Sequence, residues 1–532
     1  MKNVLSLFCS FLIAGNCLAQ KQSIDDFEPH YINWYNKDYS SDNIIGSSID
    51  KTYSDLLSGL TPKKTVVVAV IDGGVDIHHK DLEGKIWINT DEIPDNGIDD
   101  DANGYIDDIN GWNFIGNADG KNVYYENLEY TRIVKSNDAN HKDYARAKEL
   151  YERELKKRLA QKKDYTQFKA MWDKSNSLIK EHTSIEVQSH EDLLKVKSNN
   201  EAVLKAKSFL EKKYAQGVND AMINRLLENN AVYLDYYLNM NFNPRELVGD
   251  DPLNIEDKYY GNNDVAGPEA YHGTSVAGVI AANRHNGIGI DGIASHVKIM
   301  VLRSTPKGDE RDKDVALAIM YAVDNGADII NMSFSKDLSP QKEFVDIAVK
   351  YAEEKGVLLV HGAGNKGENL DVNERFPSDK YLDNSEPYNW LNVGATQMKL
   401  DEELAGIFSN YGENHVDIFA PGVDVISLDE RDAYLKTSGT SIAAPVISGV
   451  AALILSYYPE LSTDELIAII MDSAYKVKKP KKVLIPSLSG EKRKKVKFST
   501  LSKSGGIVNV YDAFKLLGER EQLSLSKSQN ID

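Results

Sequence analysis

The stretch Thr65–Asp72, TVVVAVID, is a continuous run of apolar and mostly β-branched residues that ends on a carboxylate. β-Branched side chains favour extended backbone, and a run without polar alternation is typical of a strand that is buried on both faces. Both faces of a sheet are covered when helices pack on each side of it. The run therefore predicts a central strand of a parallel α/β sheet.

Short apolar runs alternate with helical patterns from about residue 250 to 520, which predicts further βαβ units of the same sheet. The expected strands are Val297–Leu302, Ala327–Phe334, Val357–His361, Leu391–Thr396 and Val416–Phe419. The expected helices are Thr274–Ala282, Asp314–Asn325, Gln341–Lys355, Ser441–Tyr457 and Thr463–Ser473. We therefore expect a three-layer, parallel-sheet α/β domain with its sites at the carboxyl ends of the strands.

Charge and cysteine content exclude several classes of protein. The 532 residues include 62 Lys and Arg against 81 Asp and Glu, a formal net charge of −19. This balance argues against nucleic-acid binding, because phosphate contacts need clustered Lys and Arg. Cys9 and Cys17 are the two cysteines of the sequence, so neither a disulfide scaffold nor a thiolate zinc site can be built. Beyond the N-terminus no apolar run is long enough to span a bilayer, and we expect a monomer.

The first 19 residues have the pattern of a secretory signal, with Lys2, the apolar stretch Val4–Ala14 and the small-residue site Cys17–Ala19. They predict export to the periplasm, the cell surface or the medium. In an alternative interpretation, Cys17 is a lipidated N-terminus. Such processing prefers a small residue before the cysteine, and Asn16 is a poor fit to that preference. Residues 20–60 are expected to lead into the α/β domain, and residues 521–532 to form a polar tail.

Residues 125–245 differ in composition from the rest, with many Lys, Glu, Leu, Tyr and Ala and few Gly or Pro. Apolar residues such as Tyr144, Ala147 and Tyr151 recur there at helical spacing. The block predicts an all-helical insertion that divides the α/β domain into residues 61–124 and 246–520. It is either a surface appendage or an element that frames and gates the cleft.

The segment Lys476–Lys497 carries ten basic residues. A solvated hairpin is the ordinary interpretation. Alternatively, the segment binds an acidic surface or a lipid headgroup by electrostatic attraction.

Three side chains with complementary chemistry stand where a parallel α/β sheet places its sites. Asp72 ends the first strand, His272 begins a helix in HGTSVAG, and Ser441 stands where glycine gives way to a helix in SGTSIAAP. A serine hydroxyl needs an adjacent base to act as a nucleophile, histidine suits that task, and a carboxylate fixes the histidine tautomer. Asn365, among glycines after a strand, can donate to an oxyanion together with the Ser441 N–H. The set predicts acyl transfer.

The order Asp, His, Ser and the surrounding motifs resemble the subtilisin-like serine peptidase family, the subtilases, over about residues 62–115 and 255–515. Further similar stretches are His79–Leu82, Asn331–Phe334, Phe419–Gly422 and Gly505–Phe514. The resemblance implies a secreted serine endopeptidase acting on proteins or peptides. Asp72 and His272 are 200 positions apart, whereas compact members of the family separate them by only a few dozen, and the helical insertion accounts for the difference.

The resemblance also implies roles for individual residues. Asp72, His272 and Ser441 would form the catalytic triad, and Asn365 would contribute to the oxyanion hole. The segment Ser333, Phe334 and Ser335 would pair with an extended substrate, and Gly362, Ala363 and Gly364 would line the opposite side of the P1 pocket. Gly73 stands where the family often has Ser or Thr, and Ser335 stands where glycine is common.

Two other classes of protein compete with this hypothesis. The α/β-hydrolase lipases and esterases are disfavoured because Gly439–Ala443 lacks the final glycine of their nucleophile elbow and the triad order differs. An inert binding module on the same scaffold would keep the fold and predict no turnover.

Residues 91–108 contain eight acidic side chains and no Lys or Arg. Within them, Asp99–Asp107 fits the start of an EF-hand-type calcium loop. The expected ligands are Asp99, Asp101, Asn103, the Tyr105 carbonyl and Asp107, while Asn110 replaces the final bidentate Glu. The alternative is an acidic turn, but so many carboxylates would repel one another without a cation. The loop predicts structural Ca²⁺, and Asp81 matches a further calcium position of the family.

Overall fold

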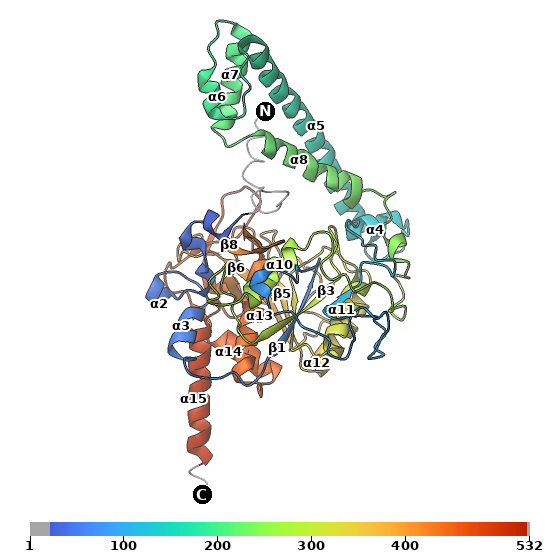
Figure 1. Ribbon diagram of the computed structural model, residues 1–532, viewed down its shortest axis with the longest axis vertical. Coiled ribbons are helices and arrows are strands. Elements are labelled where there is room, and N and C mark those ends of the chain that lie inside the picture. Colours follow the sequence, from blue (N-terminus) through green and yellow to red (C-terminus); the bar gives the residue numbers. More distant parts are fainter. Residues whose placement is uncertain (1–21, 529–532) are drawn as a thin grey trace. The chain divides into compact units, whose positions relative to one another are not determined.

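The structure is a computed structural model that describes residues 22–528 (Figure 1). The predicted signal at residues 1–19 lies outside the described residues. The chain divides into two compact units, one of Met1–Tyr124 with Pro244–Asp532 and the other of Tyr125–Asn243.

A sheet of nine strands forms the centre of the first unit, in the order β10-β13-β7-β6-β5-β4-β1-β3-β2. Every neighbouring pair from β13 to β2 is parallel, and β10 pairs with β13 antiparallel. The strands are β1 (Val66–Asp72), β2 (Gly111–Asn113), β3 (Val297–Arg303), β4 (Ile329–Met332), β5 (Leu358–Gly362), β6 (Trp390–Thr396), β7 (Ile418–Pro421), β10 (Tyr475–Lys476) and β13 (Gly506–Ile507). The six strands expected from the sequence are present, and the three that it missed have two or three residues each.

Helices cover both faces of this sheet, which confirms the three-layer α/β class. Along β1, Val66, Val68 and Val70 face one buried cluster and Ala69 and Ile71 face another. The first cluster includes residues of α3 (Ile49–Asp55), α10 (Tyr271–Ala281), α13 (Thr440–Tyr457), α14 (Thr463–Asp472) and α15 (Val510–Ser528). The second includes residues of α11 (Asp312–Asp324) and α12 (Lys342–Glu354).

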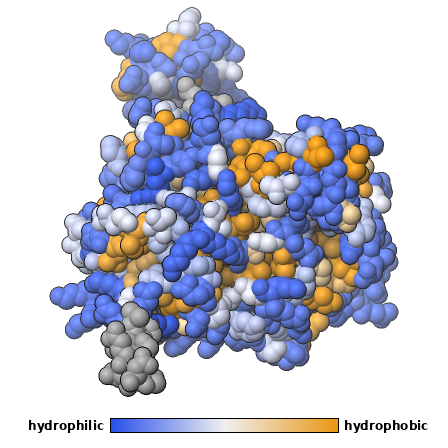
Figure 2. Space-filling view, turned by 60° about the horizontal axis from the view of Figure 1, so that its bottom comes forward, coloured by the Kyte–Doolittle hydropathy of each residue, from blue (hydrophilic) through white to orange (hydrophobic). Residues whose placement is uncertain are grey.

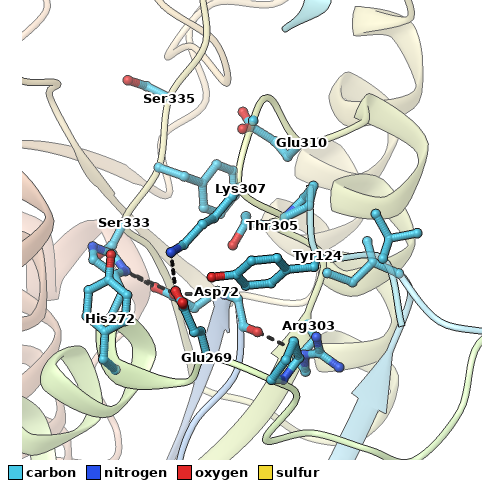
Figure 3. Close-up of a pocket in the computed structure, with 18 residues that line it drawn as sticks. Asp72, Tyr124, Glu269, His272, Arg303, Thr305, Lys307, Glu310, Ser333 and Ser335 are labelled. Carbon is cyan, nitrogen blue, oxygen red and sulfur yellow. Dashed lines mark hydrogen bonds and ion pairs between the residues drawn. The ribbon is translucent and has the colours of Figure 1, made fainter. Parts of the chain in front are cut away.

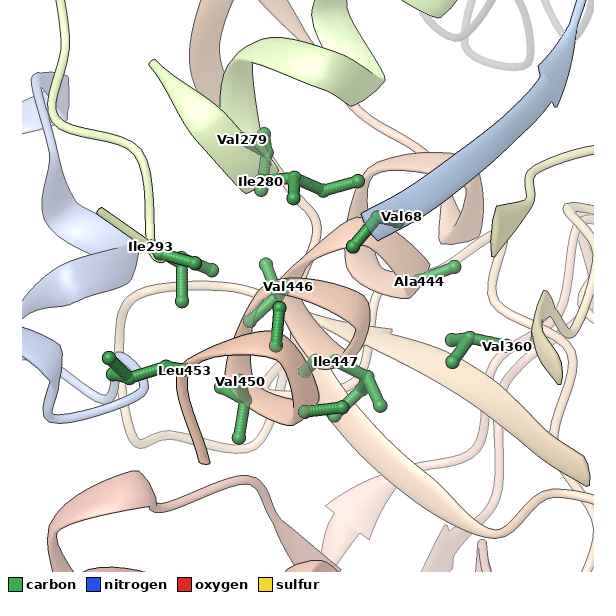
Figure 4. Packing of buried hydrophobic residues seen from close by; sticks show 14 of the residues in the cluster. Val68, Val279, Ile280, Ile293, Val360, Ala444, Val446, Ile447, Val450 and Leu453 are labelled. Atoms are coloured by element: carbon green, nitrogen blue, oxygen red, sulfur yellow. The ribbon is translucent and has the colours of Figure 1, made fainter. Parts of the chain in front are cut away.

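Helix α13 runs through the larger cluster (Figure 4). Its residues Val446, Ile447 and Val450 are completely buried, in the same cluster as Val279 and Ile280 of α10. The expectation that no apolar run is long enough to span a bilayer was wrong for α13, which alone among the described helices has that length and composition, but 89% of it is buried inside the protein. Burial of this degree is typical of the core helix of an α/β domain.

Both ends of the described chain belong to this first unit. Trp34, Tyr35 and Ile49 are completely buried in the larger cluster, so the leading segment is part of the domain. Its short helices include α2 (Tyr39–Asp42). At the other end, α15 continues to Ser528, so the predicted polar tail is helical as far as that residue.

Two hairpins lie outside the large sheet. Strands β8 (Val425–Asp429) and β9 (Ala433–Thr437) form one, and β11 (Val483–Leu484) and β12 (Lys495–Val496) form the other. The second lies in the basic segment and confirms the hairpin expected there. Figure 2 shows hydrophilic side chains over much of one face of the molecule, with apolar side chains in several separate patches.

The second unit is helical throughout its regular structure. Its helices are α4 (Glu129–Lys135), α5 (Tyr144–Thr183), α6 (His190–Lys195), α7 (Glu201–Tyr214), α8 (Asp220–Val232) and the π-helical turn η5 (Tyr233–Tyr237). Trp172, Ile179 and Leu210 are completely buried, so these helices enclose an apolar interior of their own. The chain returns to the first unit at Pro244, just before the short helix α9 (Arg245–Val248).

Candidate active site

Asp72 and His272 meet at the carboxyl end of β1. The ring Nδ1 of His272 lies 2.9 and 2.8 Å from the two carboxylate oxygens of Asp72. The backbone N–H of Gly73 donates to the same carboxylate at 2.7 Å. The first turn of α10 can approach β1 this closely because residue 273 is glycine, where an added Cβ would lie 2.1 Å from the carbonyl oxygen of Gly74. The pair borders a cavity of about 300 Å³ (Figure 3).

The surroundings of His272 act on its charge in opposite directions. Burial disfavours the imidazolium, but the negative charge of Asp72 and its hydrogen bond outweigh this effect and raise the pKa of His272. The Asp72 side chain is only 5% exposed, whereas that of His272 is 38% exposed. The buried carboxylate therefore binds Nδ1 of the ring, and Nε2 is the nitrogen that remains for proton transfer.

Ser441 is the second residue of α13, and its backbone carbonyl accepts a hydrogen bond from the Ser333 hydroxyl at 2.9 Å. It lines a second cavity, of about 280 Å³, that shares Ser333, Phe334 and Ser335 with the cavity beside His272. Within the described residues, no hydrogen bond joins His272 to Ser441. Such contacts are often long in substrate-free enzymes and tighten when substrate binds.

Asn365 follows β5 and is fixed by the start of α13. Its side-chain oxygen accepts hydrogen bonds from the backbone N–H and the hydroxyl of Thr440, at 2.8 and 3.1 Å. A Cβ added at Gly439 would lie 3.4 Å from Asn365 Nδ2 and 2.7 Å from Ser441 Oγ. The amide donor of Asn365 and the serine hydroxyl thus both lie next to Gly439.

The predicted substrate-binding residues line the second cavity with one exception. Ser333, Phe334 and Ser335 form part of its wall, together with Gly362 and Gly364. Ala363 was also expected there, but its side chain is completely buried in a third apolar cluster and does not line the cavity. Successive residues of a strand end face opposite sides, so the middle residue of this triplet points into the core.

His361 is a residue of this region that the sequence analysis did not single out. Its Nε2 lies 2.8 Å from the carbonyl oxygen of Phe334, and its Nδ1 lies 2.8 Å from the side-chain oxygen Oδ1 of Asn392. Burial lowers the pKa of His361. Both partners are acceptors, so a neutral ring donates to one of them, and the contact at Nε2 links the segment around Phe334 to β5. A single histidine on an otherwise apolar strand was the signal for it in the sequence.

The acidic loop brings together a different set of carboxylates from the one predicted. Oxygens of Glu92, Asp99 and Asp101 lie within 4.8 Å of one another. Asp107 instead accepts hydrogen bonds from the backbone N–H groups of Asn96 and Gly97 at 3.1 and 2.9 Å. Glu92 was missed because it lies outside the EF-hand spacing and reaches the loop only in the folded chain.

The donor chemistry of this loop fits a hard cation. Glu92 is buried, and its Oε1 also accepts from the backbone N–H groups of Asp100 and Asp101 at 2.7 and 3.1 Å. Asn103 donates to Asp101 at 3.0 Å. Three carboxylates held this close repel one another, and oxygen-only ligands are those that Ca²⁺ prefers.

Asp81, the further predicted calcium residue, is completely buried. Its carboxylate accepts hydrogen bonds from Asn286 Nδ2 at 2.7 Å and from the backbone N–H of Ile290 at 3.0 Å. Burial raises the pKa of Asp81.

An Asp–His pair at a strand end and a serine at a helix start, beside two cavities that share three wall residues, are an arrangement that serine hydrolases use. The sequence model of the subtilase family matches residues 63–503, and the chain belongs to this family.

Two curated relatives illustrate the similarity. Thermophilic serine proteinase of Bacillus sp. (strain AK1) is 38% identical over 186 residues, which are 35% of this chain and 42% of the relative. Major intracellular serine protease of Bacillus subtilis (strain 168) is 36% identical over 211 residues, 39% of this chain and 62% of the relative. The chain thus matches less than two thirds of the length of either protein.

Among solved structures, the epidermin leader peptide processing serine protease of Staphylococcus aureus aligns with 97% of this chain and 88% of its own. Its TM-score is 0.48 at 16% sequence identity.

Proposed function

We propose that this protein is a serine endopeptidase that hydrolyses peptide bonds through an acyl-enzyme on Ser441. The observation that carries the proposal is the His272–Asp72 pair at the end of β1, beside a cavity that shares three wall residues with the cavity lined by Ser441 at the start of α13. Membership of the subtilase family supports serine peptidase chemistry. The proposed substrates are proteins or peptides, and the sequence of residues 1–19 supports export.

The geometry supports a division of labour among the site residues. His272 Nε2 takes the proton of Ser441 Oγ as the oxygen attacks the scissile carbonyl, and later gives it to the leaving amine. Asp72 holds the ring tautomer and stabilises the imidazolium. Asn365 Nδ2 and the backbone N–H of Ser441 donate to the oxyanion. Water then releases the acyl group from Ser441.

A fluorophosphonate probe tests this proposal, since it reacts with an activated serine. We expect the probe to modify Ser441, with loss of labelling and of peptide cleavage in Ser441→Ala. Ser462→Ala is a matched control, because Ser462 also stands at a helix start, that of α14. An unlabelled wild-type protein that cleaves no peptide would favour the inert binding module instead.

We further propose that the loop around Glu92, Asp99 and Asp101 binds structural Ca²⁺. When bound, the ion would neutralise the mutual repulsion of these carboxylates and hold the acidic loop closed. The proximity of the three carboxylates supports this, as does the burial of Glu92.

Calcium should raise the melting temperature, because a ligand that binds the folded state stabilises it. We expect Glu92→Gln to abolish this shift. Asp107→Asn should lower the melting temperature, since it weakens the turn at residues 96–97, but should keep the calcium shift. Thermal unfolding with calcium, magnesium or chelator at equal ionic strength measures both effects. A wild-type melting temperature that does not respond to calcium would contradict the proposal.

A further inference from the structure

The cavity beside Ser441 has two cationic residues in its wall. Besides Ser333, Phe334, Ser335 and the two glycines, it is lined by Asn365, Lys366, Arg375, Asn410, Thr440 and Ser441. Lys366 and Arg375 are the charged residues of this lining. Both lie in the stretch 366–390, where the sequence analysis contains no motif.

The carboxylates that pair with these cations stand outside the lining. Lys366 Nζ lies 2.8 and 2.9 Å from the two carboxylate oxygens of Asp337. The Arg375 guanidinium forms ion pairs with Asp337 and with Glu368. Neither Asp337 nor Glu368 lines the cavity. A side chain that enters the cavity therefore meets the positive member of each ion pair first.

The two cations differ in how firmly they are held. The Arg375 side chain is 8% exposed, and its neighbour Phe376 exchanges backbone hydrogen bonds of 2.8 and 3.1 Å with Lys336, next to Ser335. The Lys366 side chain is 50% exposed. Arg375 is thus a pre-oriented guanidinium in the wall, and Lys366 is an ammonium that can move to meet a ligand.

We infer that this cavity receives the P1 side chain and that the enzyme prefers peptides with Glu or Asp at this position. The inference rests on the proposed function. A P1 carboxylate gains charge-assisted hydrogen bonds from groups that are already in place. A P1 Lys or Arg would be repelled by the same groups, and an apolar side chain would remove water from them without compensation.

The wild-type protein and four matched peptides provide the first test. The peptides share one sequence and carry Glu, Gln, Lys or Phe at P1. We expect kcat/KM for Glu to exceed that for Gln by about tenfold, with Lys the poorest, and we expect the Glu/Gln ratio to fall as salt is added. A ratio at or below one, or Lys or Phe as the best residue, would overturn the inference.

Fluorophosphonate labelling separates the two proposals. A protein that is labelled at Ser441 but prefers Phe or Lys refutes the specificity alone. A protein that is neither labelled nor active refutes the proposed function itself.

Single variants provide the second test. Lys366→Gln should lower the Glu/Gln ratio about threefold, and Arg375→Gln should bring it close to one. Because Arg375 is buried between two carboxylates, the melting temperature of its variant is compared with that of the wild type, and Lys366→Gln supplies the test at an exposed position. Lys495→Gln is the control, since it removes a lysine from the Lys495–Glu402 ion pair outside the cavity. An unchanged ratio in folded Lys366→Gln and Arg375→Gln would contradict the inference.

Discussion

At the scale of single residues, the carboxylate of Asp72 has two partners that arise in different ways. The N–H of Gly73 is its sequence neighbour, whereas His272 comes from the start of a helix 200 residues away. The backbone contact fixes the carboxylate, and the carboxylate in turn orients the imidazole. A hydroxyl from residue 73 is absent because this position is glycine, so the backbone donor has the greater share in holding Asp72.

This arrangement predicts the pH dependence of activity. His272 must be neutral to accept a proton, and Asp72 raises its pKa, so kcat/KM should rise with pH through a midpoint above the ordinary imidazole value of 6.5. Asp72→Asn removes the raising interaction, so the midpoint should move to lower pH. The rate should also fall by about 10⁴-fold, because the tautomer is no longer held.

The measurement is kcat/KM against pH for one peptide with an uncharged P1 residue. A midpoint that stays in place in Asp72→Asn would show that another group controls the titration.

At the scale of elements, the segment after β4 links the two cavities, and its conformation depends on the neighbouring strand. Nε2 of His361 on β5 contacts the carbonyl of Phe334, and Ser333 donates to the carbonyl of Ser441 on α13. The predicted substrate-pairing edge is therefore held by one strand and one helix. The first contact joins residues 27 positions apart in the sequence, and the second joins residues 108 positions apart.

The contact between His361 and the Phe334 carbonyl predicts an effect on peptide binding. His361→Leu replaces the ring by an apolar side chain of moderate size and removes the nitrogen that contacts the Phe334 carbonyl, so the edge should loosen and KM for an extended tetrapeptide should rise by about tenfold. The rate of fluorophosphonate labelling should change far less, because the small probe does not pair with the edge. His361→Gln, which retains an N–H donor, should recover part of the loss.

Steady-state kinetics and labelling rates, measured on the same preparations, test this role. Equal losses in peptide cleavage and labelling would indicate general damage to the fold instead of a role in positioning the edge.

At the scale of the whole molecule, each of the two units has an apolar interior of its own. The chain leaves the first unit after Tyr124 and returns at Pro244. Val123, just before the insertion, and Val248, just after it, belong to one buried cluster with Ile115. The two ends of the first unit that flank the insertion are thus held together by packing within that unit.

Replacing Tyr125–Asn243 by a short Gly/Ser linker should therefore leave the first unit folded. We expect its unfolding to remain cooperative and its cleavage of a short peptide to stay within a few-fold of the wild type. Thermal unfolding and peptide kinetics measure these outcomes, and loss of cooperative unfolding would contradict them. If the insertion gates the cleft, cleavage of a folded protein substrate should change much more than cleavage of the peptide. Equal changes on both substrates would favour a surface appendage.

The sequence by itself determined the fold class, the principal strands and helices and the identity of the candidate triad. These features depend on local sequence patterns. A β-branched run such as Val66–Ile71, for example, forms a strand that is buried on both faces of a sheet. The motifs around Asp72, His272 and Ser441 likewise stand at a strand end and two helix starts, which short stretches of sequence define.

Tertiary structure alone decided which side chains meet. Glu92 joins Asp99 and Asp101 while Asp107 turns to another part of the loop, Ala363 faces the core, and Arg375 reaches the cavity wall. Each of these outcomes depends on the direction of a side chain and on partners elsewhere in the chain. Spacing along the sequence carries no information about such distances, because the packing of the whole domain sets them.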